Sequence, residues 1–382
     1  MEFNSLSYKR TTRNITIVCG ILFFIFSFVY LFVYQNELVG VLYTSLINGH
    51  SEYSDVECII FIIFILFLLR WGVNSLLGLK GALRSLAYFP SFLLLGVITD
   101  IDNTIYHGVR INGIWSWLLP LLIIMYIIIG LFVRRIGRIW LNKKLNDVKL
   151  FNYNISYMVM MSIMTISIGN SNVDFHHELQ IENAIKEGDY IRALKIGSKS
   201  PNVNKNFTSL RNYAMLKSHK IGECLFEFPQ NYTSEALLFD EANKNNLSIK
   251  NDSIYKYLGF KAFKNEKSLN YLSRIHKFDI NNKNINDYYL AALLLDKDLK
   301  GFKLLFDSSY NDTILVPKYF QEALILYYDE KKDKLPMYIN ESIIKRYKEY
   351  LKDEKEYKSL IERNNKIHQE YGNTYWWYYT YK

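Results

Sequence analysis

Long apolar runs fill the first 170 positions of the chain, and none follows them. A helix needs about 20 predominantly apolar residues to cross the hydrocarbon core of a membrane. The pattern predicts five transmembrane helices, of which the third contains Pro90 and the fifth is rich in Met and Ser: residues 14–34, 56–77, 86–99, 114–133 and 155–168. Residues 38–47 are apolar but too few to span, so we expect them at the interface or re-entering the membrane.

The first apolar run follows Lys9, Arg10 and Arg13, as the core of a signal peptide does. It is long for such a core, and no A-x-A-like cleavage site follows Tyr34. We therefore expect a retained anchor helix.

Basic residues alternate from loop to loop, which indicates the orientation. Cytoplasmic loops are enriched in Lys and Arg close to the spans. Basic residues cluster before the first span, between the second and third, and between the fourth and fifth. The loop after the first span has none, and the loop after the third has only Arg110. With a cytoplasmic N-terminus and five spans, residues 171–382 are expected on the far, extracytoplasmic side.

The second half carries apolar residues at helical spacing between charged ones. Glu187-Gly188-Asp189 predicts a turn between two helices, and Lys220-Ile221-Gly222-Glu223 predicts a second one. Gly222 follows Gly188 by 34 residues, the tetratricopeptide period. We predict an all-α protein in which a bundle of about five transmembrane helices (residues 1–170) precedes a soluble, irregular tetratricopeptide-like helical-repeat domain (residues 171–382). A non-repeating helical bundle is the alternative.

Composition narrows the function classes. The net charge is +9, but Lys and Glu are interspersed in the second half as on a solvated helix surface, so no nucleic-acid partner is expected. Cys224 is the one cysteine of that half, which excludes an internal disulfide there. No charged residue falls in the middle of a predicted span, which disfavours a permease.

Four segments of the second half carry a resemblance: NYAMLK at 212–217, CLFEFPQ at 224–230, PKYFQEAL at 317–324 and YGNTYW at 371–376. They are similar to a family of Bacteroidetes multipass membrane proteins that is known as a domain of unknown function with a tetratricopeptide-like C-terminal half. The resemblance covers mainly residues 175–382. It implies an inner membrane and a periplasm, and brings no reaction, ligand or functional residue.

Three groups of residues could carry chemistry, and each has a simpler interpretation. Asp174, His176, His177 and Glu178 are metal-ligand types, but neighbouring side chains of a helix diverge by about 100°. Asp100, Asp102, Asn103 and His107 resemble the start of a calcium loop without its later Gly and Glu. His219 and Cys224 have no evident third group. We therefore predict no catalytic, cofactor-binding or metal-binding residue.

The chain ends in an aromatic tail, YWWYYTYK at 375–382. It could cap the last helix pair, or it could dock at the bilayer interface or on a partner.

Stacked helix pairs leave a concave surface that commonly holds peptides or protein segments. We therefore expect a non-enzymatic scaffold or adaptor of a bacterial inner membrane that binds an envelope protein or peptide. The alternative is an envelope-glycan or lipid-carrier enzyme at the periplasmic membrane face, using groups such as Asp100, Asp102 and His176.

Overall fold

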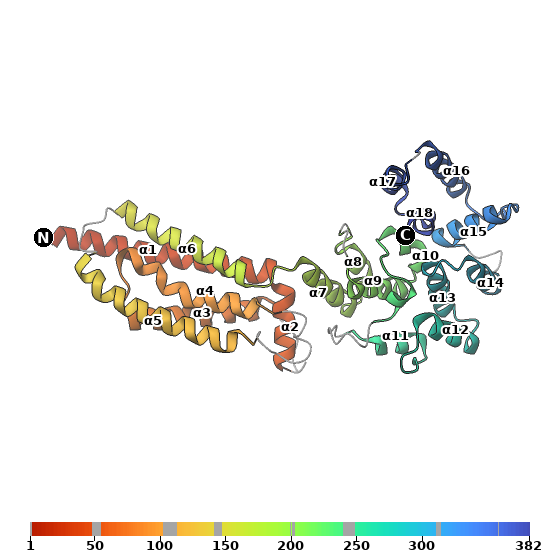
Figure 1. Ribbon diagram of the computed structural model, residues 1–382. Coiled ribbons are helices and arrows are strands. Elements are labelled where there is room, and N and C mark those ends of the chain that lie inside the picture. Colours follow the sequence, from red (N-terminus) through yellow and green to blue (C-terminus); the bar gives the residue numbers. More distant parts are fainter. Residues whose placement is uncertain are drawn as a thin grey trace. The chain divides into compact units, whose positions relative to one another are not determined.

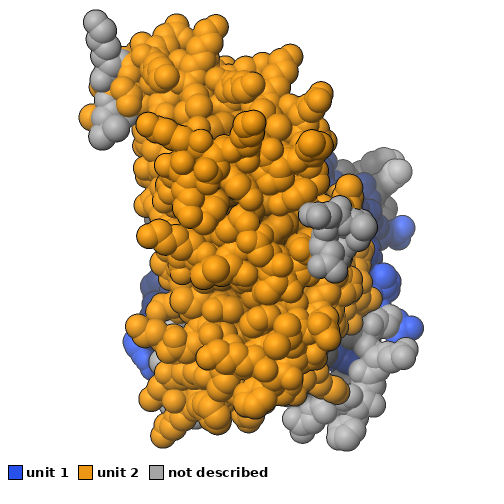
Figure 2. Space-filling view, turned by 90° about the vertical axis from the view of Figure 1, so that its right-hand side faces the viewer, with its two compact units in different colours: residues 1–176 blue, residues 177–382 orange. Residues whose placement is uncertain are grey.

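The computed structural model describes residues 2–47, 55–101, 113–140, 147–198, 200, 203–239, 249–310, 315–357 and 359–382. Every regular element in these ranges is a helix, so the predicted all-α class is confirmed (Figure 1). The chain divides into two compact units, residues 1–176 and 177–382, coloured separately in Figure 2. The predicted boundary lies six residues before this division.

Four helical stretches are long and apolar enough to cross a membrane, which indicates a membrane protein: Thr11–Tyr34, Asp55–Leu77, Gly81–Thr99 and Trp115–Val133. They correspond to the first four predicted spans. They are formed by α1 (Glu2–Val29) with η1 (Tyr30–Tyr34), α3 (Asp55–Leu77), η2 (Gly81–Tyr88) with α4 (Phe89–Thr99), and α5 (Trp115–Trp140). The second continues through Arg70 to Leu77, and α2 (Asn36–Ile47) crosses the end of the bundle (Figure 1).

The third stretch changes helix type at Phe89. In the 3₁₀ helix η2, residues three apart stack on one face. Ala82, Ser85 and Tyr88 are buried on such a face. Pro90 stands in the first turn of α4, where a missing N–H costs nothing. Pro90 therefore helps to begin an α-helix.

The predicted fifth span is helix α6 (Asp147–Ile168), which is less apolar than the other four and is not among the membrane-length apolar stretches. It packs against α1, η2 and α4, and it lies beside α1 in Figure 1. Its polar Asn154 and Thr165 are fully buried. Asn154 accepts a hydrogen bond from the Ser85 backbone N–H at 2.8 Å, and Thr165 donates to the Phe92 carbonyl at 3.0 Å.

The second unit packs its helices around one continuous apolar core. Helix α7 (Val173–Lys186) begins in the first unit and continues into the second. In chain order there follow α8 (Tyr190–Lys195), α9 (Lys205–Lys217), α10 (Ile221–Cys224), η4 (Leu225–Glu227), η5 (Ser234–Leu237), α11 (Asn251–Leu258), α12 (Ser268–Phe278), α13 (Lys283–Leu295), α14 (Leu299–Ser309), α15 (Lys318–Lys331), α16 (Glu341–Glu356), α17 (Leu360–Tyr371) and α18 (Tyr375–Tyr381). From α12 onward each helix packs on the next, while α10 contacts α13 and α15, and α18 returns to α15.

One turn geometry recurs between helices. After α7, the N–H of Asp189 bonds to the Ala184 carbonyl and that of Gly188 bonds to Ile185, with Gly188 at φ +79°. This pair of bonds is the Schellman motif. The same two bonds close α9 at His219, α13 at Lys297 and α15 at Lys332, each of which has a positive φ.

The turn predicted at Gly188 is thus confirmed, and the one predicted at Gly222 is wrong. Gly222 lies inside α10, and the left-handed residue of that turn is His219. A Cβ on Gly222 would stand 2.6 Å from the Pro317 Cβ, so Gly222 permits close packing instead. The recurring turns are unevenly spaced, and the tetratricopeptide period stays a prediction.

The aromatic tail is α18, and it is buried in the second unit. Tyr375 and Trp376 have no exposed surface. The Trp376 indole N–H donates to the Glu322 carbonyl at 3.1 Å, and the Tyr378 hydroxyl donates to the Leu295 carbonyl at 2.7 Å. These contacts are those of a cap that packs on the helical core.

Candidate functional site

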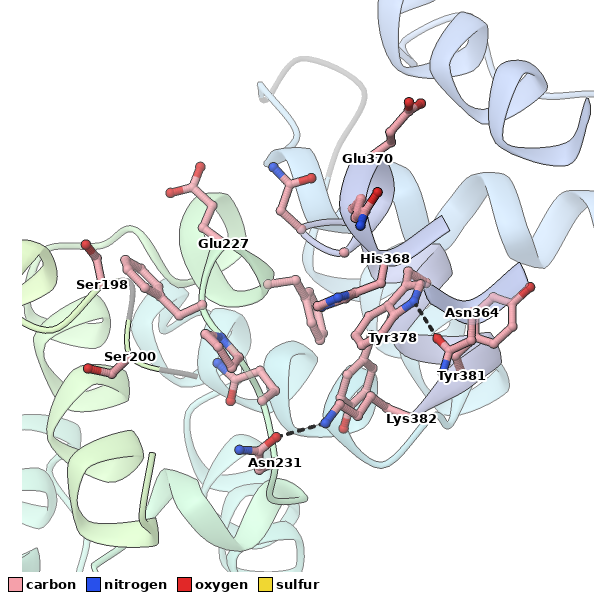
Figure 3. Close-up of a pocket in the computed structure, with 18 residues that line it drawn as sticks. Ser198, Ser200, Glu227, Asn231, Asn364, His368, Glu370, Tyr378, Tyr381 and Lys382 are labelled. Atoms are coloured by element: carbon pink, nitrogen blue, oxygen red, sulfur yellow. Dashed lines mark hydrogen bonds between the residues drawn. The ribbon is translucent and has the colours of Figure 1, made fainter. Parts of the chain in front are cut away.

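A cavity of about 700 Å³ lies within the second unit, between two walls (Figure 3). One wall comes from Ser198, Ser200 and residues 226–231. The other comes from α17 and α18, with His368 and Tyr378 facing the cavity (Figure 3). The walls therefore join segments that lie far apart in the sequence.

Arg211 holds the first wall in place. Its Nη2 donates to the Ile196 and Gly197 carbonyls at 3.1 Å each, where α8 ends. Its guanidinium lies between the rings of Phe207 and Phe228, at 4.5 Å and 4.3 Å from their centroids. Burial lowers the pKa of Arg211 to about 10, which still leaves it protonated at neutral pH. A buried cation stabilised by helix-end carbonyls and aromatic faces thus fixes Phe228 against the chain that follows α8.

The loop that follows η4 is held by Gln230, whose side-chain amide donates to the Leu225 carbonyl at 2.8 Å. This bond curls residues 226–231 back on themselves, so the ring of Phe226 packs on Tyr378 at 4.8 Å.

Trp377 organises the second wall. Its indole N–H donates to the Asn364 side chain at 3.1 Å, and the His368 ring packs on it at 4.4 Å between centroids. At one end the Lys382 ammonium donates to the Asn231 side chain at 2.9 Å, which joins the two walls (Figure 3). Packing and hydrogen bonds therefore fix the orientation of these side chains at the cavity.

The lining is rich in side-chain amides and aromatic rings. Five amides reach it, namely Gln230, Asn231, Asn364, Gln369 and Asn373, beside Phe226, Phe228, Trp377, Tyr378 and Tyr381. An amide offers both donors and an acceptor, so it can pair with groups that alternate between the two. The charged groups are mixed in sign: Glu227 and Glu370 with Lys382. Such a lining suits a neutral, hydrogen-bonding ligand with apolar parts.

The group at residues 174–178, considered above as a metal site, does not converge, because its side chains contact separate partners. The His176 Nε2 lies 3.0 Å from the Asn170 carbonyl, and the His177 ring packs against Phe207. Asn204 donates to the Glu178 carboxylate. Within the described ranges, no three His, Cys, Asp or Glu side chains are placed to hold a metal ion.

The other two candidate groups are also divided. The Trp115 indole N–H donates to the Asp100 carboxylate, while Asp102, Asn103 and His107 lie outside the described residues. His219 pairs with the Asn284 side chain at 2.8 Å. Burial raises the pKa of the Cys224 thiol to about 11, so it stays protonated at neutral pH.

Sequence reasoning missed the cavity, although two of its signals were present. The resembling segments at 224–230 and 371–376 contribute Phe226 to Gln230 on one wall and Gly372 and Asn373 on the other. Both segments combine aromatic residues with amides.

Residues 254–382 match a family described as "Family of unknown function (DUF6057)". The match covers α17, α18 and their cavity residues, and it begins after the wall at 226–231. It agrees with a resemblance to an uncharacterised family. No curated protein and no solved structure matches the chain.

Proposed function

We propose that this protein is a membrane-anchored helical adaptor whose second unit binds a segment of a cell-envelope protein or peptide in the cavity. The observation that carries the proposal is the amide- and aromatic-lined cavity between residues 226–231 and α17–α18. Ligand sites commonly have about 300–1,000 Å³, so the cavity accommodates a few residues of a polypeptide.

Polypeptide is the ligand class that this lining favours. A peptide backbone alternates donors and acceptors, which side-chain amides can match in either sense. Tyr and Trp rings add contact area and lose little side-chain entropy on binding. Charges of both signs at the rim, such as Glu370 and Lys382, select for orientation rather than for a strongly charged ligand.

The helix pairs closed by recurring Schellman turns support a tetratricopeptide-like array as the frame of this site. The resemblance to Bacteroidetes proteins leads us to propose a bacterial inner membrane as its location.

We also propose that α6 is a fifth span and that the second unit is periplasmic. Two contacts in the first unit support this. Thr11, near the start of α1, donates to Asp147 at the start of α6 at 3.1 Å. At the other end, a Cβ on Gly169 would meet the Tyr30 hydroxyl, so the end of α6 lies beside the end of α1. A helix parallel to α1 along its length crosses whatever α1 crosses.

The exposed face of α6 fits a span. Val159, Met160 and Ile163 point outward and are more than half exposed, whereas Asn154 and Thr165 face inward and are hydrogen-bonded. Membrane helices hide polar groups against their neighbours in this way.

A peptide-display selection on the full chain in detergent tests the adaptor proposal. Enriched peptides are expected to bind the wild type and to lose binding to Gln369→Trp, which fills the cavity from α17. The matched control is Lys366→Trp, an exposed position of α17 that does not line the cavity. Failure to enrich any sequence, or equal binding to both variants, contradicts the proposal.

The alternative, an envelope-glycan or lipid-carrier enzyme, places its site at Asp100, Asp102 and His176. Asp100 and His176 already hold structural hydrogen bonds to Trp115 and Asn170. Alanine at Asp102 or His176 that removes function and leaves the melting temperature unchanged would favour this enzyme over the adaptor.

A further inference from the structure

Two phenylalanines project from the second unit at α12. Phe263, in the loop between α11 and α12, is 67% exposed, and Phe278, the last residue of α12, is 69% exposed. Ile280, two residues further along the chain, is exposed as well. A single exposed apolar side chain needs no explanation, whereas several on one surface mark an interaction site.

Contacts between α12 and the loop before it join these rings into one surface. The ring of Phe278 stacks on that of Phe260 with centroids 5.8 Å apart. The guanidinium of Arg274, one turn before Phe278, lies over the Phe263 ring at 4.1 Å from its centroid. Arg274 also donates to the Lys261 carbonyl at 2.9 Å, which holds the loop against the helix. We call Phe260, Phe263 and Phe278 the phenylalanine patch.

The segment that carries the patch is the basic part of the second unit. Residues 249–283 hold eight Lys and Arg side chains against three Asp and Glu, a net charge of +5. Residues 240–248, which precede them, add two acids and one lysine and leave the net charge at +4. The whole of residues 177–382 holds 33 basic and 28 acidic side chains, a net charge of +5. Nearly all of the unit's excess positive charge therefore lies around the patch.

The three acidic side chains of this segment have partners of their own. Glu266 pairs with Arg274 at 2.8 Å, and Asp252 lies 3.7 Å from Lys261. Asp279 accepts a hydrogen bond from a neighbouring asparagine amide at 3.0 Å.

The elements packed on α12 are α13 and η5, and their acidic side chains are engaged as well. Asp287 of α13 accepts a hydrogen bond from the Tyr310 hydroxyl at 2.6 Å. Glu235 of η5 lies 3.9 Å from the Lys205 ammonium. By contrast, the exposed lysines that adjoin Phe263 and Phe278 in sequence form no ion pair among the described residues: Lys264 and Lys277.

We propose that the phenylalanine patch docks on the surface of the bilayer in which the protein is anchored, where anionic phospholipid headgroups meet Lys264 and Lys277. Exposed Phe rings flanked by lysines complement such a surface in both apolar contact and charge. Interfaces between proteins are instead depleted of Lys. Only four residues separate α6 from α7, so the first unit tethers the patch to this bilayer and raises its effective concentration there.

Fluorescence of the full chain in nanodiscs tests the proposal. The native cysteines are replaced by alanine, and an environment-sensitive NBD label is attached to Asn281→Cys, an exposed position next to Ile280. Its emission is expected to shift to the blue in phosphatidylglycerol nanodiscs and not in phosphatidylcholine nanodiscs. The control label, on Lys348→Cys of α16 at the opposite edge of the second unit from α12, should shift in neither (Figure 1).

Two sets of variants separate the apolar contact from the charge. Phe263→Ser combined with Phe278→Ser is expected to abolish the shift, while Leu304→Ser, at an equally exposed apolar position of α14, keeps it. Lys264→Gln combined with Lys277→Gln should lower the ratio of docked to free protein about twentyfold. The matched control is a pair of exposed lysines elsewhere in the unit, Lys300→Gln with Lys352→Gln, which should leave the ratio unchanged. Melting temperatures confirm that each variant folds.

Three results would overturn the proposal. The first is an equal shift in the two lipids. The second is a shift that appears only when phosphatidylglycerol vesicles are added to phosphatidylcholine nanodiscs, which would indicate a different membrane. The third is no shift in phosphatidylglycerol nanodiscs, and a shift with poly-glutamate in its place would indicate an acidic protein partner.

Discussion

Glu322 is a carboxyl that the fold encloses completely. It accepts a hydrogen bond from the Tyr375 backbone N–H at 2.7 Å, where α18 begins. Burial raises the pKa of Glu322 to about 7, and the Tyr375 bond, Lys318 and Arg346 oppose this only in part. The ordinary pKa of a Glu carboxyl is about 4.3. Between about pH 4.3 and about pH 7, Glu322 is therefore protonated in the folded chain and ionised in the unfolded chain.

Stability should therefore fall as the pH rises from about 5 to about 7 and then level off, as far as this group is concerned. Thermal unfolding followed by circular dichroism checks this. Glu322→Gln, which keeps an acceptor for Tyr375 and cannot ionise, should lose that part of the pH dependence. Parallel curves for the two proteins would show that Glu322 ionises freely in the folded chain.

Lys332 is a lysine in a conformation that favours glycine. It closes the Schellman turn after α15 at φ +58°, and it is exposed. Relief of the left-handed strain on a non-glycine residue should make Lys332→Gly more stable by about 1 kcal/mol. The control is Lys348→Gly, an exposed position inside α16, which should lose about 1 kcal/mol. Chemical denaturation measures both, and a loss at Lys332 would contradict the turn geometry.

At the scale of elements, the aromatic tail forms helix α18, which packs in the core of the second unit. Trp376 is fully buried and packs on Tyr347 at 5.1 Å. Trp376→Ala should therefore cost about 3–5 kcal/mol. Ile361→Ala, at a position 76% exposed on α17, should change stability by no more than about 0.5 kcal/mol. A tail that docks on a membrane or partner would instead tolerate Trp376→Ala, and only binding would suffer.

The sequence predicted the elements that depend on local pattern. Apolar run length was enough to place α1, α3 and α5, because the bilayer fixes the length of a span. Gly188 was recognisable because a positive φ favours glycine. His219 was not recognisable, because a histidine in the sequence does not indicate the positive φ that it adopts in this turn. Gly222 misled because a glycine needed for close packing looks the same in sequence as one needed for a turn.

The cavity depends on contacts between distant segments, which local pattern does not contain. Asn231 meets Lys382 at one end of it, and no periodicity relates the two positions. Arg211 is 2% exposed because Phe207, Phe228 and two carbonyls enclose it, and these partners come from other segments of the chain as well as from α9. The aromatic tail was noticed from sequence, but its burial follows from α15, whose position the tail itself does not encode.

At the scale of the whole molecule, α6 determines on which side of the membrane the second unit lies. Four spans return the chain to the side of the N-terminus, and five carry it across. The bond between Thr11 and Asp147 at one end, and the closeness of Gly169 to Tyr30 at the other, favour five. The basic loops all precede α6, so their distribution indicates the side of the N-terminus and does not distinguish four spans from five.

Single cysteines at the two ends of α6 test this, in a chain whose Cys19, Cys58 and Cys224 have been replaced by alanine. Ser171→Cys and Lys149→Cys both stand at exposed positions. A membrane-impermeant maleimide should label Ser171→Cys in intact spheroplasts, and Lys149→Cys only after lysis. If α6 does not cross, the two cysteines share one side and react under the same condition. Lys80→Cys is the control: it should react under the same condition as Lys149→Cys whether or not α6 crosses, because both positions follow an even number of spans.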